Sequence, residues 1–353
     1  MDLAIVGMNS TGIDLYQTMK NEVDALHLLG QAHEPGMALH GQGIMLERDD
    51  LHEIISIVNE NIKSECLIYI TNDIYYDLVM NEYGRTETWF NDNIKYFGVS
   101  HEFYSRMRDK KKYERFLASY RMVSPQNYDP EKDGAAPLPV IAKYNGLEHE
   151  NYQYKSRVIT TRTELEAERF REYAGSYIFQ KYYPPDEYLQ FSYGCFVDRG
   201  KIIADIYVRQ LGQYPQGVST LVVEDGGRPA DFISAVERLL KEEEYDGFIE
   251  FEILKSDRET VVIDLNPRPW GWFYILNFKY RNFSELACLK SKVPAEVNKR
   301  RRVWVNYSRL SAGLLKGKSF GVLKHVRLNR SFLNSLLFVY LTLRQRTGGR
   351  VRR

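Results

Sequence analysis

The sequence predicts an α/β protein built from more than one domain. A short apolar run, Leu3–Val6, enters a glycine-containing turn and is followed by a helical pattern through Met19, the order that opens an α/β unit. Further apolar, strand-like runs alternate with helical patterns along the chain. A stretch rich in Pro, Gly, Asp and Lys, Asp129–Pro139, predicts a linker between domains.

Composition narrows the class of protein. The chain has 353 residues, 44% hydrophobic and 27% charged, which excludes general disorder and provides for a sizeable core. Its three cysteines and seven histidines show neither disulfide-framework nor metal-site spacing. The segment Met1–Gly7 lacks the basic region of a signal peptide, and no run approaches the roughly 18–20 apolar residues of a membrane-spanning helix. We therefore expect a cytoplasmic location.

Residues 1–100 are predicted to form the first α/β domain. Its turn, Gly7–Gly12, matches neither the dinucleotide-binding nor the P-loop glycine pattern, so a tight turn is favoured over a nucleotide site. An amphipathic helix is predicted over 51–63 and a buried strand over Cys66–Thr71.

Residues 101–290 are predicted to form a second domain. A charged helix is expected over 101–120, ahead of the linker. Beyond the linker the pattern predicts strands over 140–144, 157–160, 177–180, 195–198, 202–208, 248–254 and 260–265, with helices beginning near 163 and spanning about 230–243.

The last two strands concentrate the polar chemistry. Because alternate residues of a strand share a face, Glu250 and Glu252 project together, as do Asp264 and Asn266. In a hairpin these side chains converge, and Mg²⁺, which prefers oxygen ligands, would relieve the repulsion between the carboxylates. A solvated polar face of the hairpin is the alternative. Trp270 and Trp272, which follow, are expected to pack rather than to stack on a substrate.

Taken together, these segments resemble the ATP-grasp superfamily, and most closely its carboxylate–amine ligase branch. Ile249–Ile253 and Val262–Arg268 resemble the metal-binding strands. The other matching segments occur in the family's order and are Asp109–Pro125, Leu138–Lys143, Phe179–Glu187 and Ile206–Pro215. The resemblance covers most of residues 1–285. It implies a Rossmann-like pre-ATP-grasp domain followed by two α+β ATP-grasp subdomains.

The resemblance also implies how ATP is held. Lys143 and one lysine of the 110–112 trio, with Lys110 the best match, would neutralise the phosphates. The hinge backbone would hydrogen-bond adenine, and Glu187 would bind the ribose hydroxyls. The hinge residues are Gln180, Lys181, Tyr182 and Tyr183. The usual glycine-rich phosphate loop is replaced by a segment with one glycine, over 144–155, so Lys155 or Arg157 would supply phosphate contacts instead.

The metal and reaction roles come from the same resemblance. Glu252, Asp264 and Asn266 would hold Mg²⁺ or Mn²⁺, with Glu250 as the alternative to Glu252. Asp264 stands where the family usually has Glu. Arg268 would stabilise phosphoryl charge, and Arg209 would face the acceptor or the γ-phosphate.

The implied activity is an ATP- and Mg²⁺-dependent ligase. It would activate a small-molecule carboxylate as an acyl phosphate and join it to a small-molecule amine, in the biosynthesis of a surface glycan or a peptide-type metabolite. One alternative is an ATP-grasp kinase, or a ligase with another nucleophile. A second is a non-catalytic nucleotide-binding protein that docks to a membrane through its basic tail.

That tail is the predicted C-terminal extension, residues 291–353. It holds sixteen Lys and Arg against one acid, whereas the first 290 residues hold 32 against 46. Within it Ser331–Leu343 is uncharged and lies between cations, which predicts an interfacial helix that could bring 316–353 to an anionic membrane or a lipid-linked substrate. A helix docked on the core is the alternative. Nucleic acid is not an expected partner, because no RNP-like or zinc motif occurs.

Overall fold

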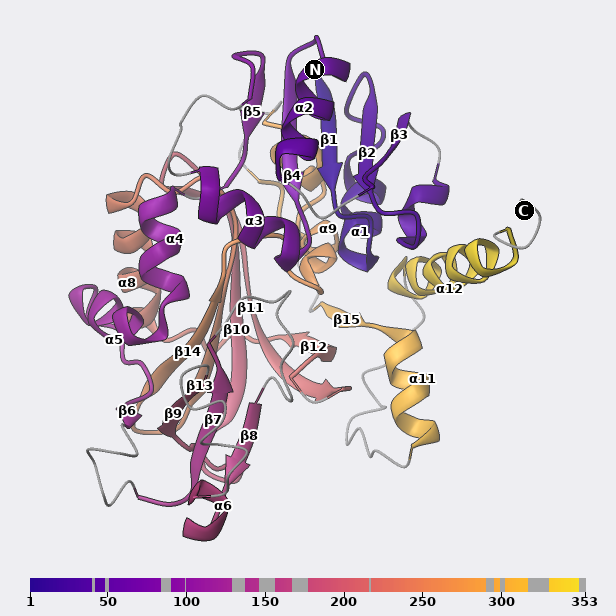
Figure 1. Ribbon diagram of the computed structural model, residues 1–353. Coiled ribbons are helices and arrows are strands. Elements are labelled where there is room, and N and C mark those ends of the chain that lie inside the picture. Colours follow the sequence, from indigo (N-terminus) through magenta and orange to yellow (C-terminus); the bar gives the residue numbers. More distant parts are fainter. Residues whose placement is uncertain are drawn as a thin grey trace.

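The structure is a computed structural model in which three β-sheets carry the fold (Figure 1). The residues it describes are 1–39, 42–47, 51–83, 90–98, 100–128, 137–145, 156–166, 177–215, 217–289, 295–298, 302–316 and 330–348.

The first sheet is parallel and belongs to the N-terminal domain. Its order is β3-β2-β1-β4-β5, and β1 and β4 are buried along their whole length because they are apolar and central. The strands are β1 (Asp2–Val6), β2 (Leu26–Gly30), β3 (Gln42–Met45), β4 (Cys66–Ile70) and β5 (Ile94–Tyr96), and the helices are α1 (Ser10–Met19), η1 (Pro35–Ala38), α2 (Leu51–Asn61) and α3 (Asp73–Tyr83).

The turn between β1 and α1 is tight, as its sequence predicts. Gly7 has φ +90°, and an added Cβ would lie 2.8 Å from the Cβ of Asn72. The amide of Met8 donates to Glu34 Oε2 at 2.8 Å, and the side chain of Asn9 accepts from two amides at the start of α1. These backbone donors, which bind phosphate in nucleotide-binding turns, are therefore engaged within the protein.

A four-stranded sheet with the order β6-β9-β7-β8 follows. The predicted helix over 101–120 is instead two helices, because the backbone is extended at Asp109 (ψ 101°). The helices are α4 (His101–Arg108), α5 (Lys110–Ser119) and α6 (Arg162–Glu166), and the strands are β6 (Asn127–Tyr128), β7 (Val140–Tyr144), β8 (Ser156–Ile159) and β9 (Tyr177–Lys181).

The largest sheet is antiparallel, with the order β14-β13-β10-β11-β12-β15. One face packs on α8 (Ala230–Glu242) through Phe232 and Val236, and the other packs on the N-terminal domain, where Phe248 meets Tyr69. A continuous core thus joins the two domains. The strands are β10 (Leu189–Asp198), β11 (Lys201–Gln213), β12 (Ser219–Glu224), β13 (Gly247–Lys255), β14 (Thr260–Asn266) and β15 (Val303–Val305).

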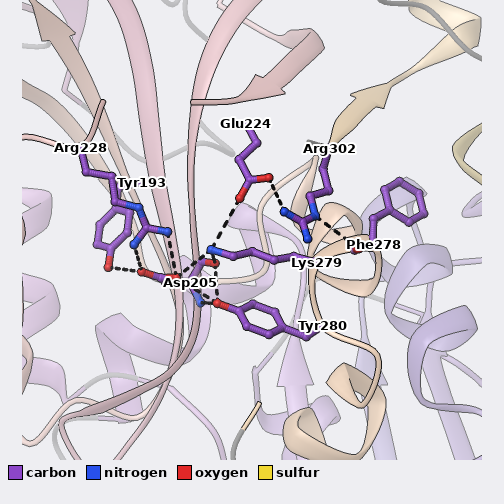
Figure 2. A network of polar contacts seen from close by, with 8 residues as sticks. All are labelled: Tyr193, Asp205, Glu224, Arg228, Phe278, Lys279, Tyr280 and Arg302. Atoms are coloured by element: carbon purple, nitrogen blue, oxygen red, sulfur yellow. Dashed lines mark hydrogen bonds and ion pairs between the residues drawn. The ribbon is translucent and has the colours of Figure 1, made fainter. Parts of the chain in front are cut away.

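Strand β15 comes from the basic C-terminal segment and pairs with β12, Val305 opposite Leu221. Beside it a buried polar network joins that segment to the sheet (Figure 2). Arg302 contacts Glu224 at 2.7 Å, and Lys279 lies 3.8 Å from Glu224 and 3.0 Å from Asp205. Arg228 contacts Asp205 at 2.6 Å. Arg302 and the strand Val303–Val305 are therefore integrated into the sheet.

Short helices complete the fold: η3 (Phe273–Ile275), α9 (Leu276–Lys279), α10 (Phe283–Ala287), α11 (Tyr307–Leu315) and α12 (Arg330–Gly348). The last of them, α12, lies against α1, η1 and α11, with Leu341 buried. Among the described residues, no helix is long and apolar enough to cross a membrane.

Candidate active site

The predicted hairpin is present, and it sets the geometry of the site. β13 and β14 are antiparallel, with Glu250 opposite Asn266 and Glu252 opposite Asp264. The register then shifts, so that Ile253 faces Val262 and Ile263 is an extra residue in a β-bulge. The alternation read from the sequence is confirmed, because it depends only on the local period of two.

Asn266 ties the two glutamates together. Its Nδ2 donates to Glu250 Oε2 and to Glu252 Oε1, both at 3.1 Å. Since the amide nitrogen is used for these bonds, the amide oxygen Oδ1 is the atom left to ligate a cation.

Glu250 is held more firmly than Glu252. It is 5% exposed, it accepts from Trp272 Nε1 at 2.8 Å, and it also receives a hydrogen bond from Ser192. Burial, with the nearby charge of Glu252, raises its pKa to about 8. Both carboxylate oxygens of Glu250 accept hydrogen bonds, Oε1 from Trp272 and Oε2 from Asn266, so the geometry favours half-buried Glu252 as the metal ligand.

Trp270 and Trp272 pack, as the sequence predicts, and each is 1% exposed. The ring of Trp270 lies so close to Gly194 of β10 that an added Cβ there would sit 2.1 Å from it. The indole of Trp272 holds Glu250, a role that its position in the sequence did not indicate. The tryptophans are therefore supports of the site.

Lys143 reaches the hairpin from the other sheet. Its strand, β7, belongs to the four-stranded sheet, and its Nζ donates to the carbonyl of the bulged Ile263 at 3.4 Å. Tyr113 of α5 is also close enough to feel these carboxylates. Burial raises the pKa of its hydroxyl, and the charges of Asp264 and Glu252 raise it further. The lysine and the carboxylates are thus brought together where the two sheets meet.

The donor set fits a hard cation that shares its ligands with a substrate. Within the described part of the chain, no three His, Cys, Asp or Glu side chains gather into a metal cluster. Two carboxylates, Glu252 and Asp264, and the Asn266 amide oxygen match Mg²⁺, which commonly takes one or two carboxylates together with substrate phosphates.

The hinge segment ends β9. Gln180 pairs with both Asn127 and Ile141, and the amide of Lys181 donates to Gln126 at 2.9 Å. Tyr182 and Tyr183, which the resemblance assigns to adenine binding, lie beyond the strand and are half-buried. Glu187 follows in an exposed turn.

The structure describes the other residues predicted to contact phosphate only in part. Lys110 begins α5, but its side chain and all of Lys155 lie outside the described residues. Arg157 pairs with Glu164 at 3.3 Å, so this alternative to Lys155 already has an acidic partner.

Arg268 makes an ion pair with Asp73 at the start of α3, with Nη2 2.7 Å from Oδ2 and a second contact through Nε. Its charge also acts on Glu250, where it opposes the rise in pKa. The arginine therefore lies beside the predicted site and links it to the N-terminal domain.

Arg209 is not brought to the carboxylates. It pairs with Phe191, whose ring lies on the side of α8, whereas Ser192 and Glu250 face the other way. The neighbouring Gln210 lies on the face of Ser192 and Glu250: its Nε2 donates to Ser192 Oγ at 3.1 Å. Its Oε1 is buried and has no hydrogen-bond partner in the described part of the chain.

Sequence reasoning missed Ser192, Gln210 and Asp73. The alternation along β10 and β11 does not show which set of side chains faces the site. Only the register between the two strands determines this. Asp73 is 195 residues from Arg268, and no local pattern connects them.

Comparisons with known proteins place the fold. No family model and no curated protein sequence matches the chain. Among solved structures, an N5-carboxyaminoimidazole ribonucleotide synthetase in complex with ADP is similar with a TM-score of 0.67 at 13% identity, over 90% of this chain and 84% of that one.

Two further structures are similar. The biotin carboxylase domain of Hydrogenobacter thermophilus 2-oxoglutarate carboxylase, in complex with MgADP, ADP and bicarbonate, gives 0.64 at 13% identity, over 84% of this chain and 71% of that one. An L-amino acid ligase from Bacillus licheniformis gives 0.57 at 14%, over 84% and 75%. The chain therefore has the ATP-grasp fold.

Proposed function

We propose that the protein is an ATP- and Mg²⁺-dependent ligase that joins a carboxylate to an amine. The observation that carries the proposal is the meeting of Lys143, from one sheet, with Glu252, Asp264 and Asn266, from the other. A cation close to a carboxylate–amide set is what a nucleoside triphosphate with its metal requires.

The reaction divides into two displacements. A carboxylate oxygen attacks the γ-phosphorus, the bond to the β-phosphate oxygen breaks, and ADP leaves. The amine nitrogen then attacks the acyl carbon, phosphate leaves, and the nitrogen loses a proton to give the amide. Splitting the condensation makes each step easier.

The chain's own residues have distinct parts in this scheme. Lys143 neutralises phosphate charge, and the 182–183 backbone orients adenine. Asn266 fixes the position of Glu252, so the carboxylate needs no reorganisation when charge develops. When bound, Mg²⁺ would supply charge neutralisation on the phosphates, held by Glu252, Asp264 and the Asn266 oxygen. Arg268 would add positive charge near the transferred group.

The substrates proposed are a small-molecule carboxylate and a small-molecule amine, in surface-glycan or peptide-type metabolite synthesis. Support comes from the similar structures, one of which is named an L-amino acid ligase. We place the enzyme in the cytoplasm, with peripheral membrane contact through 316–353, a segment with ten basic residues and no acid.

A release assay tests the proposal. The protein is incubated with ATP, Mg²⁺ and pairs of amino acids or acidic sugars, and ADP, phosphate and the coupled product are measured. We expect ADP and phosphate in equal amounts, dependent on both partners. Phosphorylated carboxylate accumulating without a requirement for amine would identify a kinase instead, and absence of ATP binding would favour the non-catalytic alternative.

A further inference from the structure

The helix α12 has two apolar faces, and the described residues cover one of them. Leu341 is 2% exposed, and the helix contacts α1 and η1. The face that carries Leu341 therefore docks α12 on the body of the protein. At the start of the helix Phe332, which lies on the opposite side from Leu341, packs on Tyr307 of α11 with ring centroids 5.2 Å apart.

The second face is exposed. Leu333 (61% exposed), Leu336 (49%), Tyr340 (58%) and Leu343 (56%) follow one another at intervals of three and four residues, which places them in a line along one side of the helix. Val339, 40% exposed, borders that line. We call these five residues the α12 stripe. Contiguous exposed apolar surface of this kind marks an interaction site rather than ordinary surface.

The charge around the stripe identifies its partner. From 316 to 353 the chain has ten Lys and Arg and no Asp or Glu, and cations stand directly on both sides of the uncharged run 331–343. An apolar helix face flanked by cations in the sequence fits the surface of an anionic bilayer. The apolar side chains enter the headgroup layer, and the cations interact with the negative charge of the lipids.

We infer that the α12 stripe inserts into the surface of an anionic membrane while the opposite face of α12, which carries Leu341, stays docked on α1 and η1. This inference refines the proposed peripheral contact by naming its surface, and it does not depend on ligase activity. Figure 1 shows α12 on the opposite side of the molecule from the four-stranded sheet, so membrane docking leaves the nucleotide side of the site in the aqueous phase.

The test uses the full chain and vesicles of phosphatidylglycerol and phosphatidylcholine, with pure phosphatidylcholine for comparison. We expect co-sedimentation with the anionic vesicles only. The triple variant Leu333→Gln/Leu336→Gln/Leu343→Gln should bind them at least tenfold more weakly. The matched control Val297→Gln/Leu315→Gln, which changes exposed apolar residues outside α12, should bind as the wild type does.

A second readout reports insertion rather than adsorption. In Leu336→Trp, the tryptophan emission should shift to shorter wavelength on addition of anionic vesicles, relative to the wild type. Three results would overturn the inference. Equal binding by the triple variant would leave only an electrostatic contact, and a wild type that stays in the supernatant at low salt would remove membrane contact altogether. A dimer abolished by the triple variant would make the stripe an interface between copies. ADP release is measured in parallel, so failure of docking and failure of ligase function are separate outcomes.

Discussion

Glu250 is a supporting residue of the metal site that we propose. Its carboxyl is buried, accepts hydrogen bonds from Trp272 and Asn266, and has a pKa raised to about 8 by burial and by Glu252. It therefore supports Asn266, whose other amide contact orients Glu252. The ligand role and the support role fall to two glutamates on one face of one strand.

The raised pKa of Glu250 predicts a pH dependence of stability. Because the folded protein holds this proton more tightly than the unfolded chain, the stabilisation is complete below about pH 4.5 and is lost as the pH rises through about 8. Glu250→Gln should flatten this decline in the metal-free protein. Urea unfolding at pH 6 to 9 measures it, with Glu237→Gln on the exposed side of α8 as the control. If the free energy of unfolding falls with pH as steeply in Glu250→Gln as in the wild type, Glu250 is already ionised in the folded protein.

Asp264 carries the sharpest prediction for activity. Asp264→Asn removes a carboxylate from the proposed donor set, so turnover should fall at least about 100-fold while the unfolding midpoint changes little. Asp264→Glu, which restores the residue usual in the family, should remain active. Full ligase activity in Asp264→Asn would exclude the assignment.

At the scale of elements, the β-bulge at Ile263 is the feature that brings the sheets together. The extra residue turns a carbonyl out of the β13–β14 ladder, and Lys143 of β7 donates to it. The lysine is thereby held next to Asp264 before any nucleotide binds. A regular hairpin would direct that carbonyl into the ladder.

Removal of this lysine should weaken nucleotide binding. A hydrogen bond to a charged group contributes about 1.5–3 kcal/mol, so Lys143→Ala should bind a non-hydrolysable ATP analogue about 10- to 100-fold more weakly in calorimetric titration. Lys241→Ala, on exposed α8 surface, is the matched control. Equal affinities in both variants would remove Lys143 from the phosphate site.

The predictable elements are those set by local pattern. The hairpin, the strand of Lys143 and the helix over 230–242 follow from periods of two and 3.6 residues in the sequence. The face of β11 cannot be predicted from its own pattern, because it depends on pairing with β10, and Gln210 rather than Arg209 reaches Ser192. Strand β15 was missed because three residues, Val303–Val305, give too short a pattern.

At the scale of the molecule, ion pairs connect parts that are distant in sequence. Asp73 and Arg268 join the N-terminal domain to the end of the hairpin, and the network around Asp205 joins α9, the loop after β12 and the start of β15 (Figure 2). Burial alone would raise the pKa of Asp205, but the charges of Lys279 and Arg228 outweigh it and lower the pKa to about 2.

Asp205 is therefore expected to be a stability residue. Asp205→Ala leaves the buried Lys279 and the half-buried Arg228 without their shared partner, so the free energy of unfolding should fall by about 3–5 kcal/mol. Asp198→Ala, which removes an exposed pair with Arg199, should change it by less than about 1 kcal/mol. Urea unfolding measures both changes. Similar losses of stability in the two variants would show that the network around Asp205 stabilises the fold no more than an exposed ion pair does.

The pairing of β15 with β12 has a practical consequence for anyone who shortens this protein. A chain that stops near residue 290, where composition suggests a natural cut, would lose Trp304 and Val305 and leave the backbone donors and acceptors of β12 facing water. An unpaired strand edge can form β-sheet hydrogen bonds with a strand of another chain. Such a fragment should form oligomers or precipitate even though its proposed catalytic residues are all present, whereas a fragment ending at Leu315 keeps the edge covered.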